Sequence, residues 1–513
     1  MENAIELKNI TKRFGTKVVA NKNVNLTLRK GEILSLLGEN GSGKTTLMNM
    51  IAGIYYPDSG SIYVNGEEAV IKSPRDAFSY KIGMIHQHFK LVDIFSAAEN
   101  IILGLKERYN LNKVNKMVKD IANRYGFDID PKKKVYEMSV SEKQTVEIIK
   151  VLYRGADILI LDEPTAVLTP QEIAKLFTIL KSMKKDGKSI IIITHKLNEV
   201  LEISDRVSIL RKGKYIGTLD TDKTNESQLT EMMVGKKVDL EIDRFHTSFD
   251  ELLLEVKDLS VLGTENHRAI KHINFDLRAG EILGVAGITG CGQKELCEAI
   301  VGLHPIKSGD IIHKGQSIAN LTPRQIIDKG IAMSFIPEDR LGMGLAPSFS
   351  ITDNMMLKTY NEGKLPFVDR KKARAEAINL IKELDIVTPS TEIAVKKLSG
   401  GNVQKVLVGR EISAGPNVII TAYPVRGLDI NSSYLIYNIL NKQKAKGVGV
   451  LFVGEDLDVM LSLCDRIMVL CHGKMMGIVD ATKTTKEELG MMMTGKEKIS
   501  DDISGKETQN DQK

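Results

Sequence analysis

One order of short motifs occurs twice along this chain, and this internal repeat constrains the fold more than any other feature. Gly287 in the second half corresponds to Gly38 in the first, and the halves close on similar segments, residues 232–235 and 492–495. The offset is about 250 residues, whereas the repeats of solenoids are roughly 20 to 50 residues long. The repeat therefore predicts two complete domains in tandem.

The first copy contains a glycine-rich loop typical of phosphate binding. Its residues 38–45 match the pattern G-x-x-x-x-G-K-[ST], between an apolar run at 33–37 and a helical run that starts at Thr46. In such a loop backbone N–H groups surround the phosphates, Lys44 neutralises phosphate oxygens and the Thr45 hydroxyl can bind Mg²⁺. The residues predicted to bind a nucleoside triphosphate are Gly38, Glu39, Asn40, Gly41, Ser42, Gly43, Lys44, Thr45 and Thr46.

A second motif places two carboxylates at the end of a predicted strand, where the apolar run 158–161 meets Asp162 and Glu163. We expect Asp162 to hold Mg²⁺ and Glu163 to polarise an attacking water molecule. Gln87 and His195 each follow an apolar run as well. From that placement Gln87 is expected to contact metal and water, and His195 to contact the γ-phosphate and orient Glu163. The predicted metal ligands are Thr45, Gln87 and Asp162, and the predicted catalytic residues are Glu163 and His195.

The second copy is altered wherever chemistry would take place. Gln293 replaces the lysine of the loop, and Lys294 replaces its hydroxyl residue. Ala422 and Tyr423 stand where the first copy has its two carboxylates. Backbone N–H groups can still surround a nucleotide there, but we expect no hydrolysis. The positions of this degenerate site are Gly287, Gly292, Gln293, Lys294, Glu338, Ala422, Tyr423 and Glu455.

In order and spacing these motifs resemble those of the ATP-binding cassette (ABC) family, from residue 1 to about residue 495. The resemblance implies an α/β fold of two tandem nucleotide-binding domains, each a P-loop NTPase sheet with helices and a helical subdomain. The helical subdomains are expected at residues 100–136 and 354–395. The expected boundaries are 1–240 for the first domain, 241–250 for a linker, 251–497 for the second domain and 498–513 for a polar disordered tail.

The family also has a signature sequence, LSGGQ, which reaches across to the partner domain's nucleotide. The second domain keeps a close version in Leu398 followed by Ser399, Gly400, Gly401 and Asn402, at the start of a predicted helix. The first domain has lost both glycines in residues 138–142, which include Ser139 and Ser141. Head-to-tail pairing would thus join the intact loop to the intact signature, giving one complete ATP site and one degenerate site.

Phe14 precedes Lys44 by about the distance at which the family often places an aromatic residue that stacks on adenine. An exposed or half-buried core phenylalanine is the other reading of Phe14.

Composition excludes some classes of protein but does not indicate a function. The net charge of +5 over 513 residues gives no nucleic-acid-binding footprint. No apolar stretch reaches the roughly 18 residues of a transmembrane helix, and the first ten residues lack a signal-peptide core, so we expect a protein kept inside the cell. The four cysteines are spaced unlike zinc knuckles and are expected to be reduced thiols.

By resemblance, the chain looks like the ATPase, or translocase, subunit of a bacterial importer, peripheral at the cytoplasmic face of the cell membrane. Its implied partners are two integral-membrane permease subunits and an extracellular solute-binding lipoprotein, and no nucleic acid. Residues 86–89 read HQHF and residues 336–340 read IPEDR, which is more similar to the nucleoside branch than to the ribose and galactose branch.

Three alternatives stay open: a monosaccharide importer ATPase, a soluble tandem ABC ATPase acting on ribosomes or DNA, and a scaffold without turnover. The soluble class normally keeps both acidic motifs, which disagrees with Ala422 and Tyr423.

Overall fold

The structure is a computed structural model of the full chain. The residues that it describes are 2–15, 18–87, 89–105, 110–166, 168–235, 242, 244–245, 250–263, 268–288, 290–358, 360 and 370–495. The predicted tail, most of the predicted linker and His88 of the HQHF segment lie outside these residues. The chain forms two compact units, of which the first comprises Met1–Leu240 with Asp429–Asn431 and the second comprises Glu241–Leu428 with Ser432–Lys513.

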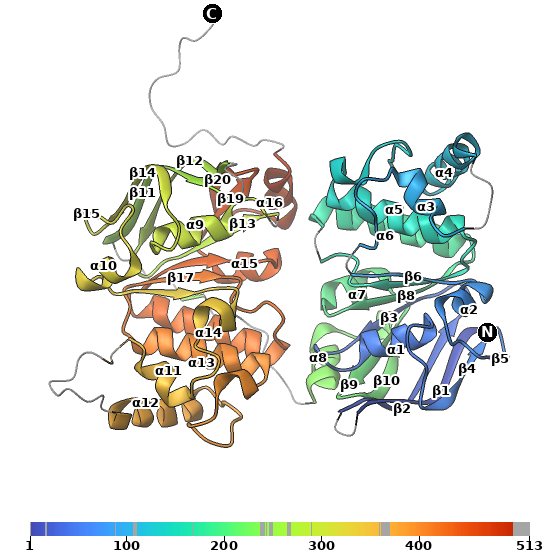
Figure 1. The fold of residues 1–513 in the computed structure, drawn as a ribbon, viewed down its shortest axis with the longest axis horizontal. Coiled ribbons are helices and arrows are strands. Elements are labelled where there is room, and N and C mark those ends of the chain that lie inside the picture. The colour runs from blue at the N-terminus through green and yellow to red at the C-terminus, as the bar shows by residue number, and fades with distance from the viewer. Residues whose placement is uncertain are drawn as a thin grey trace, which may run out of the picture. The chain divides into compact units, whose positions relative to one another are not determined.

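The first unit contains two sheets (Figure 1). A four-stranded antiparallel sheet has the order β2-β1-β4-β5, and a six-stranded sheet has the order β10-β9-β3-β8-β7-β6 with only β10 antiparallel. The strands are β1 (Asn3–Phe14), β2 (Val18–Arg29), β3 (Ile33–Leu37), β4 (Ser59–Val64), β5 (Glu67–Ala69), β6 (Ile82–Ile85), β7 (Ile158–Asp162), β8 (Ser189–Thr194), β9 (Arg206–Arg211) and β10 (Lys214–Asp220).

Helices cover both faces of the six-stranded sheet. They are α1 (Lys44–Ile51), α2 (Pro74–Ser79), α3 (Ala97–Ile102), α4 (Leu111–Tyr125), α5 (Val140–Tyr153), α6 (Pro170–Lys185), α7 (Leu197–Ile203) and α8 (Glu226–Val234). Helices α3 to α6 lie on one face, and α1, α2 and the four-stranded sheet lie on the other (Figure 1).

This double coverage explains the apolar runs in the sequence. Successive strand side chains point to opposite faces, so a strand that is buried on both faces is apolar throughout. In β7, Leu159 and Leu161 pack in the core with the helices α3 to α6, whereas Ile158 and Ile160 pack in the core that contains α1 and β1. The predicted strand at 33–37 is confirmed as β3, and the helix expected from Thr46 begins at Lys44.

The second unit repeats this architecture. Its sheets have the orders β12-β11-β14-β15 and β16-β17-β18-β13-β19-β20, the latter with only β20 antiparallel. Its strands are β11 (Leu252–Leu262), β12 (Arg268–Arg278), β13 (Ile282–Gly287), β14 (Ile306–His313), β15 (Gln316–Ser317), β16 (Met333–Ile336), β17 (Val418–Ala422), β18 (Gly449–Val453), β19 (Arg466–Cys471) and β20 (Lys474–Asp480).

The helices in the second half of the chain follow the same order as those in the first. They are α9 (Gln293–Ile300), α10 (Pro323–Asp328), α11 (Ile351–Met356), α12 (Arg370–Glu383), α13 (Gly400–Ser413), α14 (Ile430–Ala445), α15 (Leu457–Leu463) and α16 (Lys486–Met493), with a π-helical turn at Arg340–Gly344. Within the described parts of the chain, no helix has the length and apolar character needed to cross a membrane.

Candidate functional site

The glycine-rich loop of the first unit joins the central strand β3 to α1. Gly41 and Gly43 have φ angles of 78° and 96°, a region that side chains rarely adopt. A Cβ atom on Gly43 would lie 2.3 Å from the carbonyl oxygen of Ala20, and one on Gly38 would lie 2.3 Å from that of Leu210. The loop is therefore folded so closely against its neighbours that only glycine fits at positions 38 and 43.

Two polar groups of this loop fit a bound phosphate. Lys44 is 6% exposed, and its Nζ donates to the carbonyl oxygens of Gly38 at 2.6 Å and Glu39 at 3.0 Å, so the cation lies back over the loop. Burial lowers the pKa of Lys44, while the nearby carboxylates oppose that shift. The buried hydroxyl of Ser42 has no hydrogen-bond partner among the described residues. Phosphate oxygens are suitable partners for both groups.

Glu163 lies at the carboxyl end of β7 and is held there by neighbours on both sides. Its φ of 47° is unusual for a residue other than glycine, and its N–H donates to the carbonyl oxygen of Ile193 at 2.9 Å. One carboxylate oxygen accepts a hydrogen bond from Gln87 Nε2 at 2.8 Å, and the other lies 3.1 Å from His195 Nδ1. The structure thus brings together three residues that the sequence predicted from separate strand ends.

The neighbouring carboxylates of this site have opposite pKa shifts. Burial, reinforced by the charge of Glu163, raises the pKa of Asp162 from 3.8 to about 6, although Lys44 and a hydrogen bond from the Thr45 hydroxyl oppose the shift. The pKa of Glu163 is lowered, chiefly by its hydrogen bond with His195. Glu163 is therefore ionised at neutral pH, and environments that separate two carboxylates in this way are typical of sites with distinct chemical roles.

The residues predicted to bind Mg²⁺ form a small oxygen-rich group. Thr45 is the second residue of α1 and its hydroxyl hydrogen-bonds to Asp162, and Gln87 reaches the same strand end through Glu163. The described residues contain no group of three or more His, Cys, Asp or Glu side chains able to hold a metal. A hydroxyl, one carboxylate and an amide suit Mg²⁺ that is bound chiefly through nucleotide phosphates and water.

Phe14 is the last residue of β1, and its side chain is 40% exposed. Its ring packs edge-to-face against Tyr55 at a centroid distance of 5.2 Å, and Lys12 Nζ lies 5.8 Å from the ring centroid. Tyr55 is itself 37% exposed and was missed by the sequence reasoning, although the adjacent tyrosines at 55 and 56 are a visible signal. The two rings give an aromatic surface on which a base can stack.

The second unit keeps the shape of the loop but not its charges. A Cβ atom on Gly292 would lie 2.5 Å from the carbonyl oxygen of Ala269, as Gly43 does against Ala20. Gln293 is buried, and its amide donates to the carbonyl oxygen of Ile288 at 3.1 Å. Lys294 instead has a 59% exposed side chain that lies 3.8 Å from Glu298 on the same helix, so it supplies no charge to the loop.

The acidic replacements in the second unit share a cation that sequence comparison did not predict. Arg426 forms an ion pair with Glu338 through Nη1 and a second with Glu455 through Nε at 3.2 Å. Its guanidinium also lies 5.8 Å from the ring of Tyr423. Arg426 therefore neutralises part of the negative charge that the two glutamates bring to this site. The signal was its position two residues after Pro424, where the first copy has alanine.

The two signature segments begin helices of different electrostatic character. Ser399 caps α13, whose first turn has no acidic residue, and Asn402 Nδ2 donates to Ser399 Oγ at 2.9 Å. Ser139 caps α5 in a reciprocal capping box with Glu142, so a carboxylate lies in the first turn that also contains Ser141. A helix N-terminus attracts anions, but in α5 the carboxylate of Glu142 already lies there and would repel a phosphate. Of the two signature helices, α13 is therefore the one whose start favours a phosphate.

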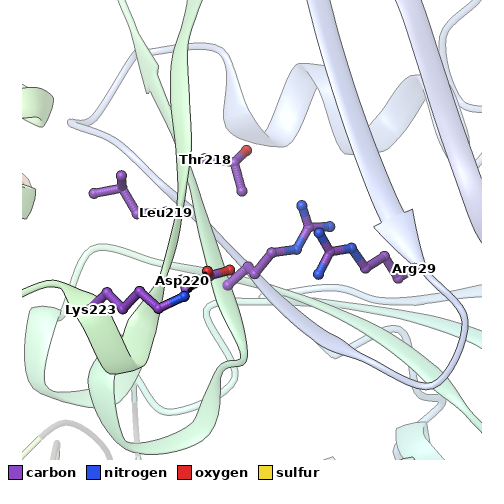
Figure 2. A pocket seen from close by; sticks show the side chains of 6 residues that line it. Arg29, Thr218, Leu219, Asp220 and Lys223 are labelled. Atoms are coloured by element: carbon purple, nitrogen blue, oxygen red, sulfur yellow. Dashed lines mark hydrogen bonds and ion pairs between the residues drawn. The ribbon is translucent and has the colours of Figure 1, made fainter. Parts of the chain in front are cut away.

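Figure 2 shows a surface pocket of about 290 Å³ that is separate from this site. Arg206 donates to both carboxylate oxygens of Glu32, at 2.7 and 3.1 Å, and Lys223 pairs with Asp220 at 3.1 Å. Arg206 pairs in the sheet with Leu34, at the start of β3, so the pocket lies at the opposite strand ends from the glycine loop. Its lining residues are Arg29, Arg206, Thr218, Leu219, Asp220 and Lys223.

Comparison with known proteins gives consistent matches over most of the chain. The family model described as "ABC transporter" matches residues 21–166 and again residues 270–424. The chain is 43% identical to a nucleoside import ATP-binding protein of Lactococcus lactis and 44% identical to a guanosine import ATP-binding protein of Bacillus subtilis, each over 96% of this chain and 98% of the relative. It is 38% identical to a glucose import ATP-binding protein of Haloferax volcanii, over 96% of both chains.

Proposed function

Because the chain belongs to the ABC transporter family, whose ATP-binding proteins are ATPases, we propose that it drives the import of nucleosides by hydrolysing ATP at a single site. The observation that carries the proposal is the arrangement of Gln87, Glu163 and His195 at adjoining strand ends, beside the glycine loop. At the corresponding strand ends of the second unit, Arg426 pairs with Glu338 and Glu455 instead.

In the first unit each residue has a definite part in the reaction. Thr45, Asp162 and Gln87 would hold Mg²⁺, which would supply positive charge next to the phosphates. The loop N–H groups and Lys44 hold the phosphates. When Lys44 binds a phosphate, its Nζ leaves the carbonyl oxygens of the loop to which it donates without nucleotide. A carboxylate oxygen of Glu163 accepts the proton of the attacking water. His195 keeps Glu163 in place through Nδ1 and leaves its Nε2 side for the γ-phosphate.

The complete site also uses the signature of the second unit. We propose that Ser399, Gly400, Gly401 and Asn402 approach the γ-phosphate of ATP held by the first unit. The absence of an acid from the first turn of α13 supports this assignment, because Glu142 would repel phosphate at the corresponding place in α5. The other composite site, with Gln293 and outward-facing Lys294, then has a structural or regulatory role.

The proposed partners are two integral-membrane permeases and an extracellular solute-binding lipoprotein, with the ATPase peripheral at the cytoplasmic face of the membrane. Nucleosides are favoured because relatives with 43 to 44% identity are named for nucleoside or guanosine import. Monosaccharides are the second candidate, since the glucose import relative and several putative ribose or galactose import relatives are 37 to 38% identical.

Uptake of radiolabelled guanosine, adenosine, ribose and galactose tests both candidates in cells that carry the whole transporter. We expect deletion and Lys44→Ala to abolish nucleoside uptake, whereas Gln293→Ala, the matched change in the second loop, retains most of it. Loss of sugar uptake alone would assign the chain to the monosaccharide candidate. Normal uptake of every compound in the deletion strain would overturn the importer proposal.

A further inference from the structure

The strand ends of the second unit are joined by charges in a way that needs no nucleotide. Glu338 follows β16, Arg426 follows β17 and Glu455 follows β18, and these three strands are neighbours in the sheet. Arg426 pairs with both glutamates. In the first unit the same three strand ends are joined through Glu163, whose contacts must serve water and nucleotide during turnover. The ion pairs of Arg426 join the strand ends through protein side chains alone.

A second arginine continues this network toward the signature helix. Arg340 begins the π-helical turn after β16, and its Nη2 donates to the main-chain carbonyl of Arg426. Its Nη1 lies 3.5 Å from the carbonyl oxygen of Gly400 and would lie 3.4 Å from a Cβ atom on that glycine. Burial lowers the pKa of Arg340, as expected for a guanidinium packed into protein. One side chain thus touches both the turn that carries Arg426 and the first turn of α13.

The π-helical turn is also attached further along α13. Arg410, in the third turn of the helix, donates from Nη2 to the carbonyl oxygen of Gly344 at 2.7 Å. Arg410 is itself held by Glu411, at 2.7 Å. The turn Arg340–Gly344 is therefore anchored to α13 at both of its ends, so movement of the turn would be passed to the helix.

The first unit makes this connection differently. There Gln144 of α5 donates directly to the carbonyl oxygen of Pro164 at 2.6 Å. The corresponding Gln404 of α13 is fully buried, yet its amide nitrogen and oxygen have no partner among the described residues. In the first unit a glutamine links the turn after the acidic strand to the signature helix, whereas in the second unit Arg340 makes this link. The first unit has Phe89 at the position of Arg340.

We propose that Arg426 and Arg340 are positioning residues that hold the start of α13 in the orientation needed to receive the γ-phosphate of ATP bound by the first unit. This inference rests on the proposed function. In this way the degenerate site supports hydrolysis at the other site. Its ion pairs, rather than a bound nucleotide, hold the signature helix in position.

The test uses the full-length chain assembled with its permeases, with Arg340→Ala and Arg426→Ala as the main variants. We expect kcat for ATP hydrolysis to fall about tenfold, in the range of coupling changes caused by positioning residues. Binding of a fluorescent ATP analogue to the first unit should be unchanged, since both residues belong to the second unit. Arg340→Lys should restore part of the turnover because a lysine can reach one of the two carbonyls. Arg324→Ala, which removes an exposed arginine of α10 that pairs with Asp328, is the matched control.

Hydrogen exchange separates positioning from general damage. Amides of residues 399–403 should exchange faster in Arg340→Ala, whereas amides of β17 and β18 should exchange as in the parent protein. Unchanged kcat and unchanged exchange at α13 in both arginine variants would overturn the inference. Ser399→Ala tests the proposed function separately: if it leaves turnover unchanged, the composite site is wrong, whereas if it lowers turnover and Arg340→Ala does not, only the positioning role fails.

Discussion

The Asp162→Asn substitution is expected to stabilise the first unit without nucleotide while abolishing its stabilisation by Mg²⁺ and ATP. Asp162 is only 6% exposed, and burial with the adjacent charge of Glu163 raises its pKa from 3.8 to about 6. A tenfold change in an acid constant corresponds to about 1.4 kcal/mol, so ionised Asp162 costs the folded state about 3 kcal/mol. Because the amide of asparagine must also be buried, we expect a net gain of about 2 kcal/mol.

The gain must depend on pH with a definite sign. Below pH 3.8 the carboxyl group is protonated in both states, and above pH 6 it is ionised in both. Between these values the folded protein binds a proton that the unfolded chain does not bind. The contribution of Asp162 to the free energy of unfolding therefore falls as pH rises through this window. The advantage of Asp162→Asn should be largest near pH 8 and small near pH 4.

Amide hydrogen exchange in β3, β7 and β8 is a suitable assay, because it reports the first unit separately from the second. Measurements without Mg²⁺ at pH 8 should show slower exchange in Asp162→Asn than in the parent. Adding Mg²⁺ and ATP should slow exchange in the parent alone, since only a state that binds ligand is stabilised by it. Glu163→Gln is the comparison: it relieves the repulsion of Asp162 but loses the hydrogen bond with His195 that lowers the pKa of Glu163, so it should stabilise the unit less than Asp162→Asn does. Faster exchange in Asp162→Asn at pH 8 would refute the burial argument.

Four further substitutions test the other parts of the site. Glu163→Gln should reduce phosphate release about 100-fold or more while ATP binding, measured by filter retention, persists; unchanged release would remove Glu163 from the mechanism. Gly43→Ala should abolish ATP binding, because its Cβ would lie 2.3 Å from the carbonyl oxygen of Ala20 at a φ of 96°, whereas Gly41→Ala, with nothing within 4 Å, should bind more weakly but measurably. Phe14→Ala should weaken ATP and GTP alike, by about 1 to 3 kcal/mol in titration calorimetry, and equal affinity in the variant would exclude stacking.

Strand positions and the first site could be predicted because both follow from burial. Strands covered on two faces read as apolar runs, as at Ile158–Asp162, and parallel strands end at one edge of the sheet. Polar residues that follow such runs therefore gather, which is why Gln87, Glu163 and His195 meet. Motif spacing sufficed here without any knowledge of side-chain packing.

The second site could not be predicted in the same way. Arg426 follows no apolar run directly, and its role depends on two glutamates that are distant in sequence and look like mere losses of function. Arg340 contacts main-chain carbonyl oxygens. Every residue has such a carbonyl, so the sequence does not indicate which one is contacted. Contacts of long charged side chains with backbone groups are set by rotamers and packing, so only the three-dimensional structure reveals them.

The turn after β17 shows that the second site has kept a demanding geometry without its original chemistry. Tyr423 has a φ of 50°, close to the 47° of Glu163, although this conformation is uncommon for a bulky side chain. Its N–H donates to Val453, as that of Glu163 does to Ile193, and the turn closes on Arg426 by a hydrogen bond of 3.2 Å. Such a backbone costs roughly 1 kcal/mol or more and persists only where surrounding structure requires it. This turn no longer carries a general base. The residue that it still positions is Arg426, which forms ion pairs with Glu338 and Glu455.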